Sequence, residues 1–106
     1  MEKQTAGRDA LGKLAPEFAR LNDDVLFGEV WSREDKLSLR DRSMITISAL
    51  MAQGLYPQVK SHIVLGKKNG LTKEEVVEIV TQLAFYTGWA KAWSVFPLVE
   101  EVYKDE

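Results

Sequence analysis

Apolar residues recur at spacings of three and four along most of this chain, and this recurrence is typical of helices that bury one face. It is first seen at Leu11, Leu14, Phe18 and Leu21 and returns in each later segment up to Tyr103. No segment alternates between apolar and polar residues as a half-buried strand would. The sequence therefore predicts an all-α fold of about six helices.

Proline divides the first part of the chain. Pro16 interrupts the apolar pattern and suits the first turn of a helix. We therefore expect a short helix to about Lys13 and a second helix from Pro16 to about Val30. The charged, aperiodic segment 31–37 predicts a loop. The second helix is expected to carry one apolar face, formed by Phe18, Leu21 and Val25.

The middle of the chain contains an almost wholly apolar run, residues 44–52. Ser38 is placed to cap the helix that contains this run, and Gly54 is placed to end it. A helix that is apolar on nearly every side is expected at the centre of its domain or of an oligomer.

Three more signals organise the rest of the chain. Pro57 is expected to open a helix that stops at Asn69. Thr72 and Glu75 have the spacing of a capping box, which predicts a helix to about Thr87. The last helix is predicted from Trp89 to Tyr103 with a kink at Pro97. It carries two apolar stripes, namely Trp89, Phe96, Val99 and Tyr103 on one side and Val95, Leu98 and Val102 on the other.

Composition excludes several classes of protein. With 106 residues and a mass of 12.0 kDa, the chain is expected to form a single domain spanning 1–106. A net charge of −2 without a basic face argues against nucleic-acid binding. The absence of cysteine excludes disulfides, thiolate metal sites and thiol redox chemistry. No apolar run approaches the length of a membrane span, and no secretory leader is visible. We therefore expect a soluble, cytoplasmic protein. No metal site is expected either, because the single histidine has no second nitrogen or sulfur ligand near it.

His62 is the chain's only histidine and the only side chain whose ordinary pKa suits proton transfer near neutral pH. It falls in the middle of a predicted helix. Gly66, one turn later, is expected to leave open space beside the imidazole. One interpretation is a general acid in a site. The other is a structural histidine bonded to a backbone carbonyl.

Arg40, Arg42 and Lys60 are the cations that could hold a carboxylate substrate near His62. Each has a plainer interpretation as a surface cation or an interfacial ion pair. Trp89 and Trp93, four residues apart, are more typical of a core or a subunit contact than of a ligand-binding box. The hydroxyl residues of the apolar run have no base placed beside them, so we do not interpret them as nucleophiles.

Several motifs together resemble the carboxymuconolactone decarboxylase family. They are an L-S-x-R-x-R-S start before the apolar helix, a histidine before N-G-L-T, the E-E-V-x-E-I run and the closing Y-T-G-W-A-K-A-W-x-x-F-P. The resemblance covers about residues 37–103. It implies an alkylhydroperoxidase D-like helical bundle built around a helical hairpin and assembled as a homo-oligomer, commonly a hexamer.

The family that this sequence resembles has two functional branches. The redox branch carries Cys-x-x-Cys-x-x-x-His and a glutamate one helix earlier. On this sequence its two cysteines fall on Leu55 and Gln58, its histidine on His62 and its glutamate near Ser43. Without a thiolate, peroxide reduction by that mechanism is not expected.

The other branch is the decarboxylase of aromatic compound catabolism, which converts 4-carboxymuconolactone without a cofactor. The resemblance implies a lyase in which His62 donates a proton and Arg42 or Lys60 binds a small carboxylate. The alternative is a non-catalytic, oligomeric ligand-binding or structural protein with the same fold.

Overall fold

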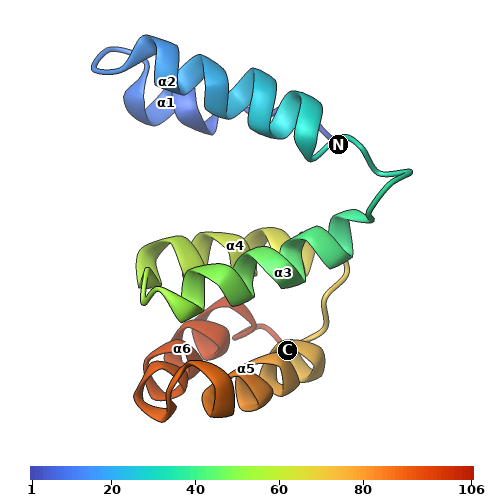
Figure 1. Ribbon diagram of the computed structural model, residues 1–106, viewed down its shortest axis with the longest axis vertical. Coiled ribbons are helices and arrows are strands. Elements are labelled where there is room, and N and C mark those ends of the chain that lie inside the picture. Colours follow the sequence, from blue (N-terminus) through green and yellow to red (C-terminus); the bar gives the residue numbers. More distant parts are fainter. The chain divides into compact units, whose positions relative to one another are not determined.

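Every regular element of the chain is helical, which confirms the all-α prediction (Figure 1). The computed structural model describes residues 1–106. The chain divides into two compact units, Met1–Leu39 and Arg40–Glu106. No helix is both long enough and apolar enough to cross a membrane.

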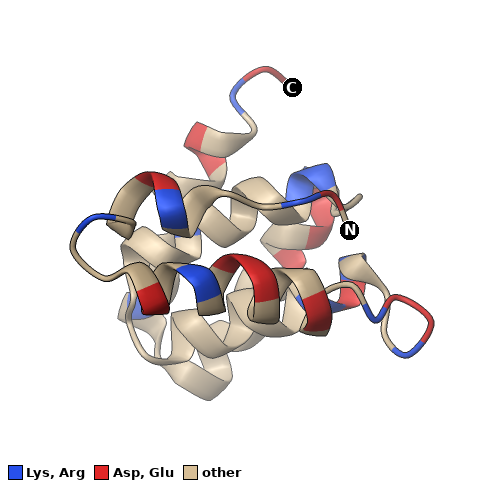
Figure 2. Ribbon diagram, turned by 90° about the horizontal axis from the view of Figure 1, so that it is seen from above, with Lys and Arg blue, Asp and Glu red and all other residues tan.

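The first unit contains helix α1 (Ala6–Leu11), helix α2 (Pro16–Arg20) and a π-helix, η1 (Leu21–Val30). Proline occupies the start of α2, as predicted, and η1 continues α2 to the predicted end near Val30. The wider winding of η1, seen in the bond from Trp31 N–H to the Leu26 carbonyl, was not predicted. Figure 2 shows that acidic residues predominate on the helix formed by α2 and η1.

The prediction of an apolar face on this helix is wrong. Phe18 and Leu21 are 61% and 42% exposed, whereas Ala19 and Asp23 are buried. The physical reason is a polar contact between helices. The Asp23 carboxylate accepts hydrogen bonds from the backbone N–H groups of Gly7 and Arg8, at 2.8 and 3.0 Å. That contact turns the Ala19–Asp23 side of the helix toward α1 instead.

Gly7 fits this contact because it has no side chain. A Cβ atom there would stand 2.7 Å from an Asp23 carboxylate oxygen. Burial acts to raise the pKa of Asp23, but hydrogen bonds from Asn22, Arg8 and Gly7 outweigh it and lower the pKa overall. A buried carboxylate therefore stays ionised at the N-terminal end of α1, where the exposed N–H groups favour negative charge.

The second unit contains α3 (Leu39–Ala52), α4 (Tyr56–Lys68), α5 (Lys73–Thr87) and α6 (Trp89–Val102). The predicted boundaries hold closely. Gly54 follows α3 with a positive φ of 70°, which a glycine adopts without strain. Thr72 and Glu75 form the predicted capping box, with bonds of 3.1 and 3.0 Å. α6 continues through Pro97 to Val102.

One apolar core holds the second unit together, and all four of its helices contribute. The buried side chains are Ile47, Met51, Val59, Ile63, Leu71, Val76, Val80, Ala84, Ala92, Val95, Val99 and Tyr103. The two stripes predicted on α6 are therefore wrong in detail. Val95 and Val99 share the buried face with Tyr103, while Trp89 is 61% exposed.

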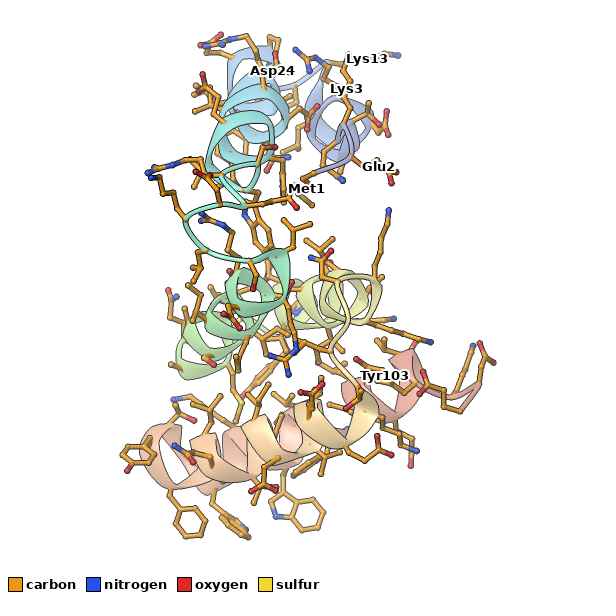
Figure 3. All side chains as sticks on the ribbon, turned by 90° about the vertical axis from the view of Figure 1, so that its right-hand side faces the viewer. Met1, Glu2, Lys3, Lys13, Asp24 and Tyr103 are labelled. Carbon is orange, nitrogen blue, oxygen red and sulfur yellow. The ribbon has the colours of Figure 1, made fainter.

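Tyr103 fastens the end of α6 to the connection between α4 and α5 (Figure 3). Its hydroxyl donates a buried hydrogen bond of 2.6 Å to the Leu71 carbonyl, and burial raises the pKa of this phenol. The Lys67 ammonium lies 5.2 Å from the centre of the ring. These contacts close the core at this end of the second unit.

Candidate active site around His62

His62 lies in the middle of α4, next to the stripe of buried residues by which this helix joins the core. The residue is partly buried and its Nδ1 atom is withdrawn from solvent. Burial lowers the pKa of the imidazole, because a low-dielectric surrounding disfavours the charged form. At neutral pH the ring is therefore predominantly neutral, although it remains within reach of the surface.

Gly66 does not leave the open space beside His62 that we expected. A Cβ atom at Gly66 would stand 2.9 Å from Leu71 Cδ1, 3.4 Å from Ile47 Cδ1 and 3.5 Å from Ser43 Cβ. The glycine is buried and its bare side is already occupied. The glycine allows a close approach of Leu71, which follows α4, and of the Ile47 and Ser43 side chains of α3 to the backbone of α4.

Ser43 lies at this close approach and is fully buried. Its hydroxyl accepts a hydrogen bond of 3.0 Å from the Asn69 side chain. This position lies near the one that the redox branch fills with a glutamate. Here the polar group links the C-cap of α4 to α3, a contact that nothing in the local sequence pattern revealed.

Arg42 precedes Ser43 on α3 and is partly buried. It lies on the helix that packs against α4 through Gly66. The structure thus brings together the two helices that carry Arg42 and His62. Arg40, on the same helix, forms ion pairs with Glu75 and, at 3.6 Å, with Asp41.

Lys60 is not brought to His62. Residues two apart on a helix point to different faces, and the Lys60 ammonium lies 2.7 Å from the Glu101 carboxylate on α6. This ion pair lowers the pKa of Glu101. Glu101 was missed by sequence reasoning because it lies 41 residues away along the chain and follows no local motif.

Two pockets in the second unit were also missed. The first, of about 390 Å³, lies between α5 and α6 and is lined by Trp89, Trp93, Phe96 and other mainly apolar residues. The second, of about 420 Å³, lies between α3 and α5, beside the Arg40–Glu75 ion pair. No group of three or more histidine, cysteine or acidic side chains is arranged to hold a metal ion.

Residues 16–101 match the carboxymuconolactone decarboxylase family, which accounts for most of the chain. The chain belongs to this family. As a carboxymuconolactone decarboxylase family member it has the alkylhydroperoxidase D-like helical fold, and the resemblance seen in its motifs is confirmed.

Two relatives show how this family member compares with known proteins. It is 35% identical over 89 residues to a 4-carboxymuconolactone decarboxylase of Acinetobacter baylyi, a match that covers 84% of this chain and 66% of that protein. This chain thus spans just under two thirds of that relative. It is 27% identical over 99 residues to an uncharacterized 15.0 kDa protein of Paracoccus denitrificans, covering 92% of this chain and 73% of that protein.

Proposed function

We propose that this family member is a cofactor-free carboxy-lyase that acts on a small carboxylated lactone in the breakdown of aromatic compounds, with His62 as the proton donor. The observation that carries the proposal is the single histidine, half-buried on α4 with a lowered pKa. The match to a relative named 4-carboxymuconolactone decarboxylase supports the choice of substrate class.

The proposed reaction needs one proton and no redox partner. The bond between the lactone carbon and its carboxylate breaks, and carbon dioxide leaves. The electron pair of that bond stays on the substrate as a dienolate, which the lactone carbonyl stabilises. The His62 imidazolium then protonates carbon, and the imidazole regains its proton from water.

The lowered pKa of His62 is compatible with this role if the substrate supplies the opposite charge. In the free protein, burial keeps the ring neutral. A carboxylate bound beside it favours the protonated ring and raises the pKa. Substrate binding would then favour protonation of His62, which donates this proton in the next step.

Arg42 is our first choice of the two proposed carboxylate-binding residues. It lies on α3, the helix packed against α4, and a guanidinium can bind a carboxylate through two hydrogen bonds. We therefore assign the carboxylate first to Arg42 and keep Lys60 as the second choice.

The test is the release of carbon dioxide from 4-carboxymuconolactone by the purified full-length protein. We expect His62→Gln to lower kcat by about 100-fold or more and Arg42→Gln to raise KM. Lys104→Gln, at an exposed lysine outside the proposed site, serves as the matched control and should retain activity. An active His62→Gln variant would remove the histidine from the chemistry.

A second measurement separates a general acid from a structural histidine. In an NMR titration, a bound dicarboxylate should raise the pKa of His62. A ring that ignores every carboxylate ligand would contradict the proposed proton donor even if the protein binds the ligand elsewhere.

A second candidate function is a non-catalytic protein that keeps the family fold and binds a small ligand. It is favoured by the use of polar residues for structure, since Ser43 binds Asn69 and Lys60 binds Glu101. Thermal stabilisation by lactones or dicarboxylates without turnover would support it. Peroxide reduction by thiols is not proposed, because Leu55 and Gln58 stand where the redox branch has cysteines.

We also propose that the protein is a homo-oligomer, with a hexamer as the expected form. Exposed apolar side chains in the second unit support self-association, most of all Phe85, Tyr86, Trp89 and Trp93. Light scattering at micromolar concentration should give a mass several times 12.0 kDa. A stable, folded monomer would contradict this proposal.

A further inference from the structure

Four aromatic side chains at the turn between α5 and α6 face away from the core of the second unit. Phe85, Tyr86, Trp89 and Trp93 are 76%, 80%, 61% and 71% exposed, and aromatic side chains project from this layer in Figure 3. The rings of Phe85 and Trp89 meet edge to face, with their centres 5.8 Å apart. We call these four residues the aromatic surface.

The aromatic surface continues into the pocket of about 390 Å³ between the same two helices. Trp89 and Trp93 belong to both. The rest of the pocket lining is mainly apolar, with Phe96 and Pro97 on one side and Glu100 as its only charged residue. The surface therefore combines protruding rings at the end of α5 with an apolar hollow beside them.

The segment that carries this surface is nearly free of charge. Between Ile79 and Val99 the only charged residue is Lys91, although 28% of the whole chain is charged. The Lys91 ammonium donates a hydrogen bond of 3.2 Å to the Thr87 carbonyl, at the end of α5. Depletion of charge together with enrichment in aromatic residues is characteristic of the centre of a protein–protein interface.

The exposed area matches what a pair of identical copies needs. With about 200 Å² for each aromatic side chain, the exposed fractions leave roughly 575 Å² of these four residues in water. This is at the upper end of the largest apolar patch found on monomers, about 300–600 Å². Two such surfaces in contact would bury roughly 1,150 Å², above the approximately 1,000 Å² expected of a specific interface.

We propose that the aromatic surface is a two-fold interface between two copies of this chain, in which the Phe85 and Tyr86 rings of each copy pack against the pocket beside Trp93 of the other. A two-fold axis pairs the same surface with itself, so the protruding rings and the hollow satisfy each other twice. The surface offers no charge pattern that would select a nucleic acid or a charged protein instead. This inference rests on the self-association proposed above and does not depend on catalysis.

The test compares the mass of the full-length protein with that of variants, by light scattering and sedimentation at micromolar concentration. Trp93→Glu places a charge at the centre of the interface, and we expect the mass to fall to about half of the wild-type value or less, because one two-fold contact is lost. Trp93→Phe should retain the wild-type mass. Val64→Glu is the matched control, since Val64 is an apolar residue of α4 that is 53% exposed.

The outcomes separate this inference from the broader proposal of self-association. A monomeric wild type would overturn both, and binding of that monomer to phosphatidylcholine vesicles would assign the aromatic surface to lipid instead. An oligomeric wild type whose folded Trp93→Glu variant keeps its mass would overturn this inference alone. Equal dissociation of the Trp93→Glu and Val64→Glu variants would also overturn it, because the effect would not be specific to this surface.

Discussion

Replacing Tyr103 by phenylalanine isolates one hydroxyl group that ties the end of α6 to the rest of the second unit. The Tyr103 side chain is 1% exposed, and its hydroxyl donates at 2.6 Å to the Leu71 carbonyl. Phenylalanine keeps the ring and its contact with Lys67. It removes the donor, and so leaves a buried carbonyl oxygen without that partner.

The magnitude follows from the loss of the bond and the burial of its acceptor. A typical hydrogen bond contributes about 1 kcal/mol, and an unsatisfied buried group costs about 1–3 kcal/mol. We expect Tyr103→Phe to lower the free energy of unfolding by about 1–2 kcal/mol. With a urea dependence of about 1.5 kcal/mol per molar, the unfolding midpoint should fall by roughly 1 M.

The measurement is urea unfolding followed by circular dichroism, with wild type and variants at the same protein concentration because oligomers gain stability with concentration. Tyr56→Phe is the matched control for loss of a hydroxyl, since Tyr56 is only partly buried and lies outside the aromatic surface, so it should show almost no change. A Tyr103→Phe midpoint equal to that of wild type would refute the view that this bond fastens the core. An equal loss in both variants would refute it as well.

Two further predictions concern close contacts inside each unit. Gly66→Ala should destabilise the protein by up to about 2 kcal/mol in urea unfolding. The cost of overpacking against the buried Leu71 is about 1–3 kcal/mol, and the gain in helix propensity offsets about 1 kcal/mol of it. A more stable variant would show that Leu71 moves aside easily. Asp23→Asn should lower the thermal unfolding temperature at neutral pH. Because the pKa of Asp23 is lowered in the folded protein, its carboxylate stabilises the fold above the unfolded pKa, and this effect is lost as the pH falls through the folded pKa. The difference in unfolding temperature between variant and wild type should therefore shrink in acid. A difference that persists unchanged would contradict the carboxylate's role.

Helix boundaries in this chain could be predicted because the signals that set them are local. Pro16, Gly54 and the pair Thr72 and Glu75 act on backbone groups within one turn. Their effect therefore barely depends on the rest of the fold. The family motifs around His62 were recognisable for the same reason, since they lie in continuous stretches of sequence.

The buried face of each helix and the partners of its polar side chains could not be predicted, because both depend on residues distant in the sequence. Asp23 reaches α1 across 16 residues, and Lys60 reaches Glu101 across 41. Apolar spacing alone does not say which side of α6 meets the core, and the exposed Trp89 was therefore placed on the wrong stripe. The close approach at Gly66 depends on Leu71, Ile47 and Ser43 together.

The late position of Tyr103 bears on how the chain acquires its structure during synthesis. The contacts of the first unit lie within residues 1–39, and Asp23 needs only residues that the ribosome has already made. The core of the second unit, by contrast, includes Val95, Val99 and Tyr103. We expect the first unit to form while translation continues and the second to close only after residue 103 has emerged. Until then the apolar sides of α3 to α5 lack their last partner, and nascent chains are most exposed to aggregation and to chaperones during this interval.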